Sequence, residues 1–506
     1  MVKFIDDRLN SITMYRLVLY YLIFLLGVAE VLSIAGLLPF SPLTLFVSVL
    51  FLTAVCWLAN GLFASTFRVP ANVESVYISA LILALIVPPA QMTHDLLFLA
   101  WVSIIAMASK YILAINRKHV FNPVAFAVAL TALTVNQTAT WWVGSAAMLP
   151  FVLIGGLLIV RKVRRFEMVF SFLITSLLVT LAFTLLSREN VVTALQQTIL
   201  ESPLVFFAAV ILTEPLTTPP TRVLQLIYGA LVGFLFAPQF HIGSFYITPE
   251  LSILIGNVFS YIVSPKAKLV LKLKDRIQTA PDTFDFIFTP NRKLSFAPGQ
   301  YMEWTLGHDH PDSRGNRRYF TLASSPTEQD LILGVKFYPK SSSYKKSMLA
   351  LDGDTEIVAG QLSGDFTLPK NPNQRLVFIA GGIGITPFRS MITYLLDTRQ
   401  KRPITVFYAN RTANEIVYKD ILTRAQRELG IKTVYTLTDK NRVPAGWKGK
   451  VGYLTSHMIM ADVPFYKDCI YYLSGPNSMV NAFEETLQRM GVSPDHIRTD
   501  FFPGFA

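Results

Sequence analysis

Long apolar segments fill the first half of the chain, from residue 13 to residue 263, and then stop. A helix needs about 20 mostly apolar residues to cross a bilayer. By that measure the sequence predicts ten candidate membrane spans, some of them short, at residues 13–36, 43–63, 76–90, 95–115, 120–136, 141–160, 167–187, 200–214, 225–237 and 246–263. Lys, Asp and Arg become frequent from Lys266 onward, so we expect a polytopic membrane domain over residues 1–264 that ends near Ser264 and Pro265.

The second half of the chain alternates between apolar and polar residues over short distances. Strand-like runs of this kind lie at Lys268–Leu273, Phe284–Phe288 and Asp330–Val335. Short strands joined by turns are typical of an antiparallel β-barrel, which we expect over residues 265–370. From Arg375 onward apolar strands alternate with helical segments, which is the pattern of a parallel, doubly wound α/β sheet. We expect that α/β domain to occupy residues 371–506.

Composition supports a membrane-embedded half. Of the 506 residues 52% are apolar, which is high for a soluble protein. The formal net charge is +12, but the basic residues form short clusters between apolar spans rather than one basic stripe. We therefore expect membrane lipid, and no nucleic acid, as a partner.

The distribution of charge predicts an orientation. With the N-terminus inside, the basic residues that flank the predicted spans fall on the cytosolic side, Arg188 excepted. Ten spans, or eight with two re-entrant segments, then place the second half of the chain in the cytosol. The first apolar run, Ile12–Leu38, is long enough to span and lacks a small-residue cleavage site, so we expect an anchor. The predicted location is the inner, cytoplasmic membrane.

Few residues of the first half are suited to hold metal or to move ions. Cys56 and Cys469 are the only cysteines, too few for a cysteine-ligated cluster. The histidines before residue 266 all lie near predicted span ends: His94, His119 and His241. Neither a relay of haems nor any other metal centre is therefore predicted. Carboxylates within the spans are sparse, with Glu30 and Glu214 the main candidates for moving cations.

Two stretches of the membrane half interrupt the apolar pattern. In Arg117–Pro123 basic residues precede Asn122, and Thr213–Arg222, which contains Glu214, is rich in proline and threonine. Broken, hydroxyl-rich backbone at membrane depth usually lines a site, so both stretches are candidates for a second site. Ordinary helix capping and turn formation is the alternative.

The same two stretches carry a resemblance to known membrane proteins. The segments RKHVFNPVAFAVAL and ILTEPLTTPPTR resemble RnfD of the Rnf electron-transport complex and NqrB of the sodium-translocating NADH:quinone reductase, over most of residues 75–263. These proteins carry flavin, so the resemblance implies FMN or riboflavin in the membrane domain. Relatives attach FMN to a threonine in a Ser-Gly-Ala-Thr type motif, which this sequence lacks. Thr193 and Thr198, in the corresponding predicted external loop, have no small neighbours of that kind, so covalent attachment is not expected.

A four-residue motif in the predicted barrel indicates flavin. Arg318-Tyr319-Phe320-Thr321 resembles the Arg-x-(Tyr/Phe)-(Ser/Thr) signature of the ferredoxin–NADP reductase superfamily, and the resemblance extends over nearly all of the second half. It implies bound FAD. A guanidinium can pair with the FAD diphosphate, an aromatic ring can stack on the isoalloxazine, and a hydroxyl can hydrogen-bond the flavin N5. We assign these roles to Arg318, Phe320 and Thr321, with Arg317 and Tyr319 as the register-shifted alternative.

Two further turns suit phosphate groups. Ser342 and Ser343 precede a helical run where the superfamily has a diphosphate-binding turn, and an ordinary N-cap is the alternative. The stronger motif is a glycine turn between a buried strand and a helix. Its members are Gly381, Gly382, Gly384, Thr386 and Pro387. Glycines let backbone approach a diphosphate, and the order of motifs matches the nicotinamide-nucleotide loop of the superfamily.

Two other strands end in residues that suit the nucleotide. Arg411 follows one strand, while Ser474, Gly475 and Pro476 end another. Ligands of open α/β sheets bind at such carboxyl ends. Ser474 stands where many relatives have a cysteine beside the nicotinamide, a place that a hydroxyl also fits. Arg411 suits either the 2′-phosphate of NADPH or solvent.

The last residues of the chain resemble a flavin cover. Relatives place a C-terminal aromatic residue beside an acidic one over the flavin, and this chain has Asp500-Phe501-Phe502. We expect Phe501 or Phe502 to act as that lid, with Asp500 nearby. A hydrophobic tail packed onto the sheet is the alternative.

Together these motifs predict a membrane-bound, NAD(P)H-dependent flavoprotein oxidoreductase. We expect hydride to pass to FAD near Thr321, Ser474 and Phe501, and the flavin to release electrons singly or in pairs. The next acceptor is expected in the membrane domain, as a second flavin or a quinone, with a partner redox protein as a further possibility. The alternatives are an electron conduit to an external acceptor, a redox-driven ion transporter, and a flavin reductase with an inert membrane anchor.

Overall fold

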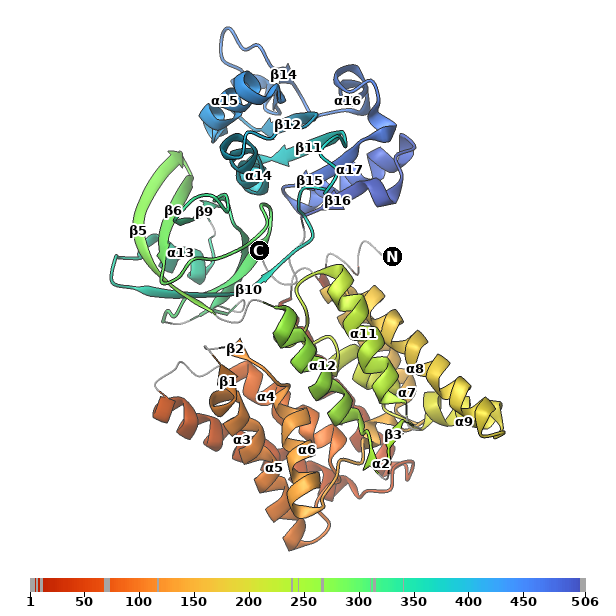
Figure 1. Ribbon diagram of the computed structural model, residues 1–506. Coiled ribbons are helices and arrows are strands. Elements are labelled where there is room, and N and C mark those ends of the chain that lie inside the picture. The colour runs from red at the N-terminus through yellow and green to blue at the C-terminus, as the bar shows by residue number, and fades with distance from the viewer. Residues whose placement is uncertain are drawn as a thin grey trace. The chain divides into compact units, whose positions relative to one another are not determined.

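The computed structural model describes the chain except for residues 1–4, 6–7, 10–11, 68–72, 116–117, 238–239, 244, 265–267, 310, 313–314, 340 and 501–506. The chain divides into two compact units, a membrane unit that ends at Lys268 and a reductase unit that begins at Leu269 (Figure 1). The membrane unit is helical, and the reductase unit contains one antiparallel and one parallel sheet. The predicted fold class is confirmed.

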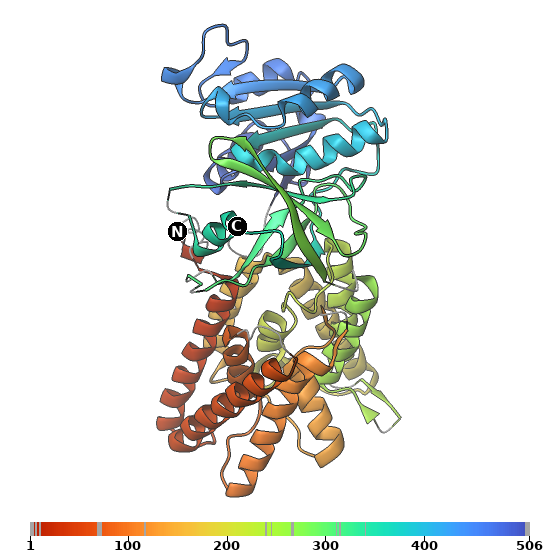
Figure 2. The same ribbon diagram turned by 90° about the vertical axis from the view of Figure 1, so that its left-hand side faces the viewer.

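Apolar helices make up most of the membrane unit (Figure 2). They are α2 (Met14–Ile34), α3 (Pro42–Phe67), α4 (Val73–Ile86), α5 (Thr93–Ile112), α6 (Pro123–Val135), α7 (Leu149–Val163), α8 (Phe166–Leu186), α9 (Val191–Leu200), α10 (Leu204–Phe206), the π-helix η2 (Phe207–Ile211), α11 (Arg222–Phe236) and α12 (Pro249–Val263). Among the described residues, α2, α3, α5 and α8 have the length and composition to cross a membrane. The segments α9 and α10–η2, bent by 54°, form a further candidate span, and α4, α6, α11 and α12 are shorter apolar helices.

One predicted loop is a helix. The sequence predicts an external loop at Thr193 and Thr198, but both residues lie on α9. Asn190 caps this helix, since its side chain accepts hydrogen bonds from the backbone N–H groups of Val192 and Thr193. The hydroxyl of Thr198 donates to the carbonyl of Ala194 at 2.8 Å. The loop prediction was wrong because polar side chains here interrupt the apolar pattern without interrupting the helix.

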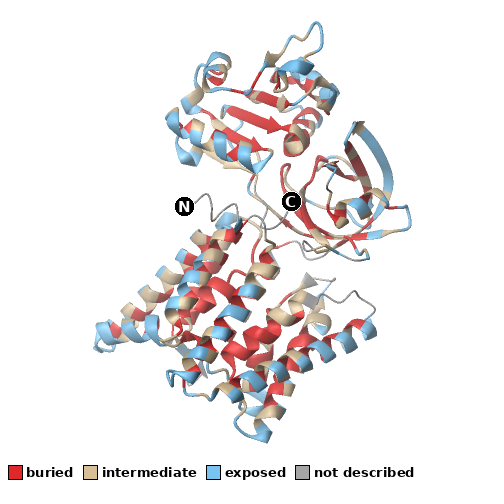
Figure 3. Ribbon diagram, turned by 180° about the vertical axis from the view of Figure 1, so that it is seen from behind, coloured by how far each residue is buried: buried red, intermediate tan, exposed pale blue. Residues whose placement is uncertain are grey.

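Close backbone contact joins α8 to α11. A Cβ added at Gly229 would lie 2.4 Å from the carbonyl oxygen of Met168, and one at Gly233 would lie 2.4 Å from that of Phe172. These glycines are four residues apart on α11, so together they let the two helices approach as small residues do in membrane proteins. Both buried and exposed positions occur along the helices of the membrane unit (Figure 3). Leu186 is one of its exposed large apolar residues.

The first sheet of the reductase unit is antiparallel and curls into a half-barrel (Figure 1). Its strands, in the spatial order β8-β7-β10-β5-β6-β9, are β5 (Leu269–Ala280), β6 (Thr283–Pro290), β7 (Tyr301–Thr305), β8 (Arg317–Thr321), β9 (Leu331–Lys336) and β10 (Glu356–Ser363). Alternate side chains such as Phe286 and Phe288 fill its core together with Trp304. Helix α13 (Ser343–Leu349) lies between β9 and β10 in the chain.

The second sheet is parallel, with the order β14-β13-β12-β11-β15-β16. Its strands are β11 (Leu376–Gly381), β12 (Ile404–Asn410), β13 (Lys432–Leu437), β14 (Lys450–Val451), β15 (Ile470–Ser474) and β16 (Ile497–Thr499). Helices α14 (Thr386–Asp397) and α15 (Lys419–Leu429) pack on one face, and α16 (Ser456–Asp462) and α17 (Asn477–Arg489) on the other. The direction of winding reverses between β11 and β15. Ligands of doubly wound sheets bind at such a switch point.

Candidate functional site

The glycine turn lies at this switch point, between β11 and β15. A Cβ added at Gly384 would lie 2.4 Å from the carbonyl oxygen of Ser474, so only glycine lets the turn pack against the end of β15. Gly382 has a φ of +54°, in the left-handed region. Among the described residues nothing lies within 4 Å of a Cβ built there, so this side of the turn is open to a ligand.

Thr386 and Pro387 shape the start of α14. The Thr386 hydroxyl donates to the carbonyl of Ile383 at 3.2 Å and thereby closes the turn. Pro387 lies in the first helical turn, where a missing N–H costs no hydrogen bond. The backbone N–H groups of this first turn are the ones left for an anion.

The residues after β15 pack against the same glycine turn. A Cβ added at Gly475 would lie 3.2 Å from the backbone of Gly381, and one at Gly381 would lie 3.3 Å from the ring of Pro476. Thus the structure brings these predicted residues together with the glycine turn. Phe501 and Phe502, predicted to cover the flavin, lie outside the described residues.

Arg318 and Phe320 lie on one face of β8, and Arg317 and Tyr319 lie on the other, because side chains alternate along a strand. Arg317 forms an ion pair with the buried Glu303 at 3.5 Å, and the Tyr319 hydroxyl donates to the same carboxylate at 2.9 Å. Arg317 and Tyr319, the register-shifted alternative, therefore both contact Glu303 through their side chains. Arg318 is 2% exposed and Phe320 is half-buried.

An anionic side chain lies beside Arg318. The carboxylate of Asp312 is 3.7 Å from the Arg318 guanidinium and accepts the backbone N–H of Ser343 at 3.1 Å. The Ser343 hydroxyl in turn accepts the Asp312 N–H at 2.9 Å, while Ser342 caps α13 by accepting from Lys345. A guanidinium and a backbone N–H thus hold one anion between them already. This donor set fits the phosphate groups of FAD.

Thr321 and Ser474 meet on Asp500. Both hydroxyls donate to its Oδ2 atom, each at 3.1 Å, so the end of β8 and the end of β15 share one carboxylate. The Oδ1 atom is buried and has no hydrogen-bond partner among the described residues. Burial raises the pKa of Asp500 to about 7, against an ordinary 3.8, although the two hydroxyls act in the opposite direction. This carboxyl group therefore titrates near neutral pH.

Arg411 is exposed at the end of β12, and its backbone pairs with that of Asp439, an acidic residue not predicted as part of the site. The Arg411 carbonyl accepts the backbone N–H of Asp439 at 3.1 Å. The Asp439 side chain accepts from the N–H of Asn441 and lies 3.7 Å from Arg442. An acidic side chain, Asp439, and a basic one, Arg442, therefore lie close together beyond the carboxyl ends of β12 and β13. An acidic residue just after a parallel strand was the signal available in the sequence.

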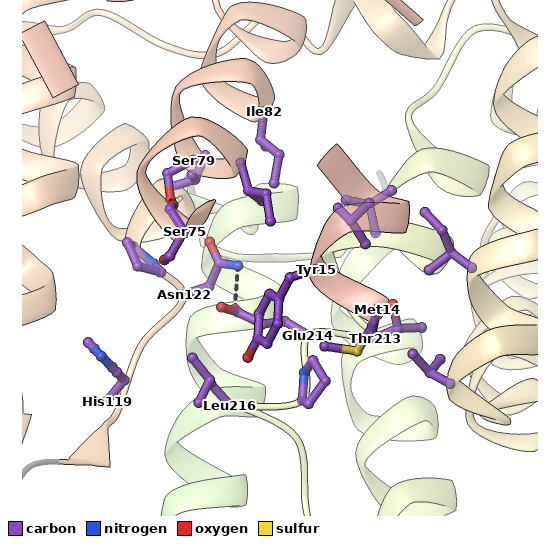
Figure 4. A pocket seen from close by; sticks show the side chains of 18 of the residues that line it. Met14, Tyr15, Ser75, Ser79, Ile82, His119, Asn122, Thr213, Glu214 and Leu216 are labelled. Atoms are coloured by element: carbon purple, nitrogen blue, oxygen red, sulfur yellow. Dashed lines mark hydrogen bonds between the residues drawn. The ribbon is translucent and has the colours of Figure 1, made fainter. Parts of the chain in front are cut away.

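In the membrane unit the two interrupted stretches come together. Asn122 caps α6 and its side-chain Nδ2 donates to Glu214 Oε2 at 2.7 Å, although 92 residues separate them (Figure 4). Both line a cavity of about 80 Å³, which has room for several water molecules. Lys110 also lines it, and its ammonium donates to the carbonyl of Ser75 at 2.9 Å. The side chains of Glu214, Asn122 and Lys110 thus line one cavity.

A buried series of hydrogen bonds next to this cavity was not predicted from the sequence. The backbone N–H of Asn122 donates to Asn257 at 2.8 Å, and the amide of Asn257 donates to the Tyr228 hydroxyl at 3.2 Å. Nearby on α12, Glu250 is 2% exposed and accepts from the indole N–H of Trp141 at 3.2 Å. Asn and Glu inside a short apolar helix were the available signal, since membrane helices rarely bury such groups without a partner.

Comparison with known proteins covers both units. Residues 378–485 match the family model described as Oxidoreductase NAD-binding domain, and residues 141–267 match that of the NQR2, RnfD, RnfE family. NADH-cytochrome b5 reductase 1 of Aspergillus terreus is 31% identical over 210 residues, 40% of this chain and 70% of that protein. The F component of the Na(+)-translocating NADH-quinone reductase of Serratia proteamaculans is 29% identical over 204 residues, 39% of this chain and about half (47%) of that protein.

Among solved structures, the cytochrome b5 reductase domain of Ulva prolifera nitrate reductase is similar, with a TM-score of 0.41 and 22% identity. The match covers 47% of this chain and 98% of that one. The two family models and the similarity to the Aspergillus terreus reductase define an NAD-binding oxidoreductase joined to a membrane domain. The chain belongs to the ferredoxin–NADP reductase superfamily, and its membrane unit carries the match to the NQR2, RnfD, RnfE family. Both predicted resemblances are confirmed.

Proposed function

We propose that the reductase unit oxidises NADH and that the electrons pass through FAD to an acceptor in the membrane unit. The observation that carries the proposal is the meeting of Thr321, Ser474 and Asp500. It joins the flavin strand of the half-barrel to the nucleotide edge of the parallel sheet. Hydride transfer needs donor and acceptor atoms in near contact, and this is where the two sheets converge.

In this proposal the half-barrel holds FAD. Arg318 and the N–H of Ser343 bind the diphosphate, where the Asp312 carboxylate now lies, with Ser342 shaping that turn. Phe320, on the same face of β8 as Arg318, stacks on the flavin, and Thr321 hydrogen-bonds its N5 position. FAD, when bound, supplies the hydride acceptor and can release electrons singly or in pairs.

The glycine turn and the first turn of α14 hold the diphosphate of the nicotinamide nucleotide. Gly381, Gly382 and Gly384 allow the close approach, and Thr386 and Pro387 set the direction of the helix. Ser474 then orients the nicotinamide, with Gly475 and Pro476 shaping the floor of the site. Asp500 takes up or releases a proton near neutral pH.

NADH is the nucleotide that the charges at the sheet edge favour. The Asp439 carboxylate lies 3.7 Å from Arg442, and the backbone of Asp439 pairs with that of Arg411, at the edge where we propose that the adenosine end binds. A carboxylate can accept a hydrogen bond from a ribose 2′-hydroxyl but repels a 2′-phosphate. The relatives named for NADH support the same choice.

The cavity that Asn122 and Glu214 line is the proposed site of the next acceptor, a quinone or a second, non-covalent flavin. Its amide, carboxylate and ammonium groups offer both donors and acceptors to a redox-active ring. A partner redox protein is the further recipient to consider. The basic residues that flank the apolar helices support an inner-membrane location with the reductase unit in the cytosol.

Flavin counting tests this proposal. The detergent-solubilised full-length protein is precipitated with acid, and released FAD, FMN and riboflavin are quantified per chain. We expect one FAD, all flavin in the supernatant, and anaerobic bleaching of the FAD by NADH. A protein without FAD, or one whose FAD is not reduced by NADH, would refute the reductase role. A second flavin supports the membrane site as a flavin site, and its absence leaves quinone as the proposed acceptor.

A further inference from the structure

A second joint between the half-barrel and the parallel sheet lies away from Asp500. Its centre is Arg389 on α14, which is only 8% exposed. The guanidinium donates from Nη1 and Nη2 to the two carboxylate oxygens of Glu328, at 2.6 and 3.0 Å. Nη1 also donates to the backbone carbonyl of Ala323 at 2.8 Å. The hydroxyl of the next residue, Ser390, donates to the backbone carbonyl of Ser324 at 2.6 Å.

The two sides of this joint begin next to the proposed reacting groups. Arg389 lies three residues after Thr386, where α14 leaves the glycine turn. Ala323 lies two residues after Thr321, where β8 ends. The joint therefore ties the first turn of the nucleotide helix to the end of the flavin strand. Any change in its geometry is passed on to the separation of hydride donor and acceptor.

A second contact braces the same joint from α15. Tyr418 has a φ of +56° and its hydroxyl donates to Asp285 at 2.6 Å. Its ring faces the guanidinium of Arg389, with 5.6 Å between the Cζ atom and the ring centroid. Gly334 on β9 makes space for the Tyr418 side chain, since a Cβ at Gly334 would lie 2.6 Å from the Tyr418 hydroxyl. A non-glycine residue rarely adopts the backbone conformation of Tyr418, so the surrounding contacts must hold it.

We propose that Arg389 and Glu328 are positioning residues that set the distance and angle of hydride transfer. They act through α14 and through the turn after β8, and this inference rests on the proposed function. A two-pronged guanidinium–carboxylate pair fixes both distance and orientation, which a lysine ammonium cannot do. A misplacement of about 1 Å between reacting groups can slow a reaction about 100-fold. A buried guanidinium held by three hydrogen bonds from Nη1 and Nη2 is rigid enough to provide that precision.

The test measures hydride transfer directly in the full-length, detergent-solubilised protein. Arg389→Lys and Glu328→Gln are mixed with NADH, or with NADH deuterated at the transferred position, in a stopped-flow instrument. We expect flavin reduction at saturating NADH to slow by about 10- to 100-fold, with a larger deuterium isotope effect. FAD content and the Kd for NADH should stay within about 3-fold of wild type. Glu428→Gln, in the exposed pair with Arg424 on α15, is the matched control and should keep the wild-type rate.

Rates are expressed per bound FAD, so a less stable variant still gives a reading. Wild-type hydride transfer in the FAD-loaded fraction of both variants would overturn the positioning role. If Arg389→Lys yields no protein with bound FAD, Glu328→Asp replaces it in the test. This substitution keeps the charge and shortens the side chain by one methylene, so it also changes the geometry of the pair. Failure of NADH to reduce the wild-type FAD would instead refute the proposed function, because it does not depend on these substitutions.

Discussion

At the scale of single residues, Asp500 connects the reductase site to pH. Its folded-state pKa of about 7 lies above the ordinary 3.8, so the folded protein keeps a proton that the unfolded chain has already lost. The associated stability is present at low pH and is lost as the pH rises from about 4 through about 7. The same titration changes the charge beside Thr321 and Ser474, the two hydroxyls that meet on this carboxylate.

We expect Asp500→Asn to remove a pH transition near neutrality from flavin reduction. The asparagine keeps the shape and one acceptor oxygen for the two hydroxyls but has no proton to exchange. Stopped-flow rates from about pH 5 to about pH 8 measure the effect, and the Tm of wild type relative to the variant should fall over the same range. A wild-type rate profile that is flat across this range would contradict the assignment.

Asp439 gives a prediction about nucleotide choice. In Asp439→Ser the cations Arg411 and Arg442 are no longer opposed by that carboxylate, so the 2′-phosphate of NADPH is repelled less. We expect the ratio of kcat/KM for NADPH over NADH to rise about 10-fold or more. Steady-state assays with both nucleotides measure it, with Glu428→Gln as a control for the loss of one charge. An unchanged ratio would place the adenosine end elsewhere.

Residue-level prediction from the sequence was limited by partners that lie far away in the chain. The motif at β8 left two registers open, because alternation assigns faces but does not say which face meets a ligand. In the structure Arg317 and Tyr319 contact Glu303, and Arg318 contacts Asp312. Arg389 gave no signal either, since its partner Glu328 is 61 residues away and only the fold brings them together.

At the scale of elements, the glycine turn is the tightest junction in the parallel sheet. We expect Gly384→Ala to destabilise the reductase unit by about 1–3 kcal/mol, because the new Cβ meets the carbonyl of Ser474 at 2.4 Å. NADH binding should weaken in parallel, as β11 and β15 move apart. Denaturant unfolding and NADH titration measure the two effects. Gly353→Ala, whose Cβ would make only ordinary contact at 3.7 Å, should change stability by less than about 0.5 kcal/mol.

Elements were the most predictable level of this protein. The strand-like runs at Phe284–Phe288 and Asp330–Val335 lie in β6 and β9, and the glycine turn joins β11 to α14, because local alternation and turn chemistry determine them. The helix α9 and the π-helix η2 were not anticipated. Polar side chains interrupt the apolar pattern over α9, and a π-helix is a rare local variant of the α-helix.

At the scale of the whole molecule, two compact units allow the two halves of the reaction to be separated. We expect Glu214→Gln to leave NADH reduction of FAD and of a soluble acceptor unchanged. Quinone reduction in proteoliposomes should fall by at least about 10-fold, because an ionisable hydrogen-bonding group has been removed from the cavity.

Glu30→Gln is the matched control for this experiment, since Glu30 is a carboxylate of α2 that does not line the cavity. It should behave as wild type with both acceptors. If Glu214→Gln also reduces quinone at the wild-type rate, the membrane acceptor does not bind between Asn122 and Glu214. An inert anchor would then be the better description of the membrane unit.

The division of one chain at residues 268 and 269 has a consequence for kinetics. A reductase that must find its membrane partner by diffusion slows down when both are diluted. Here covalent continuity keeps one electron donor for each membrane unit, at an effective concentration set by the linker rather than by the cell. In the proposed pathway the step between the units is therefore first order, and it proceeds equally well at a single copy per vesicle.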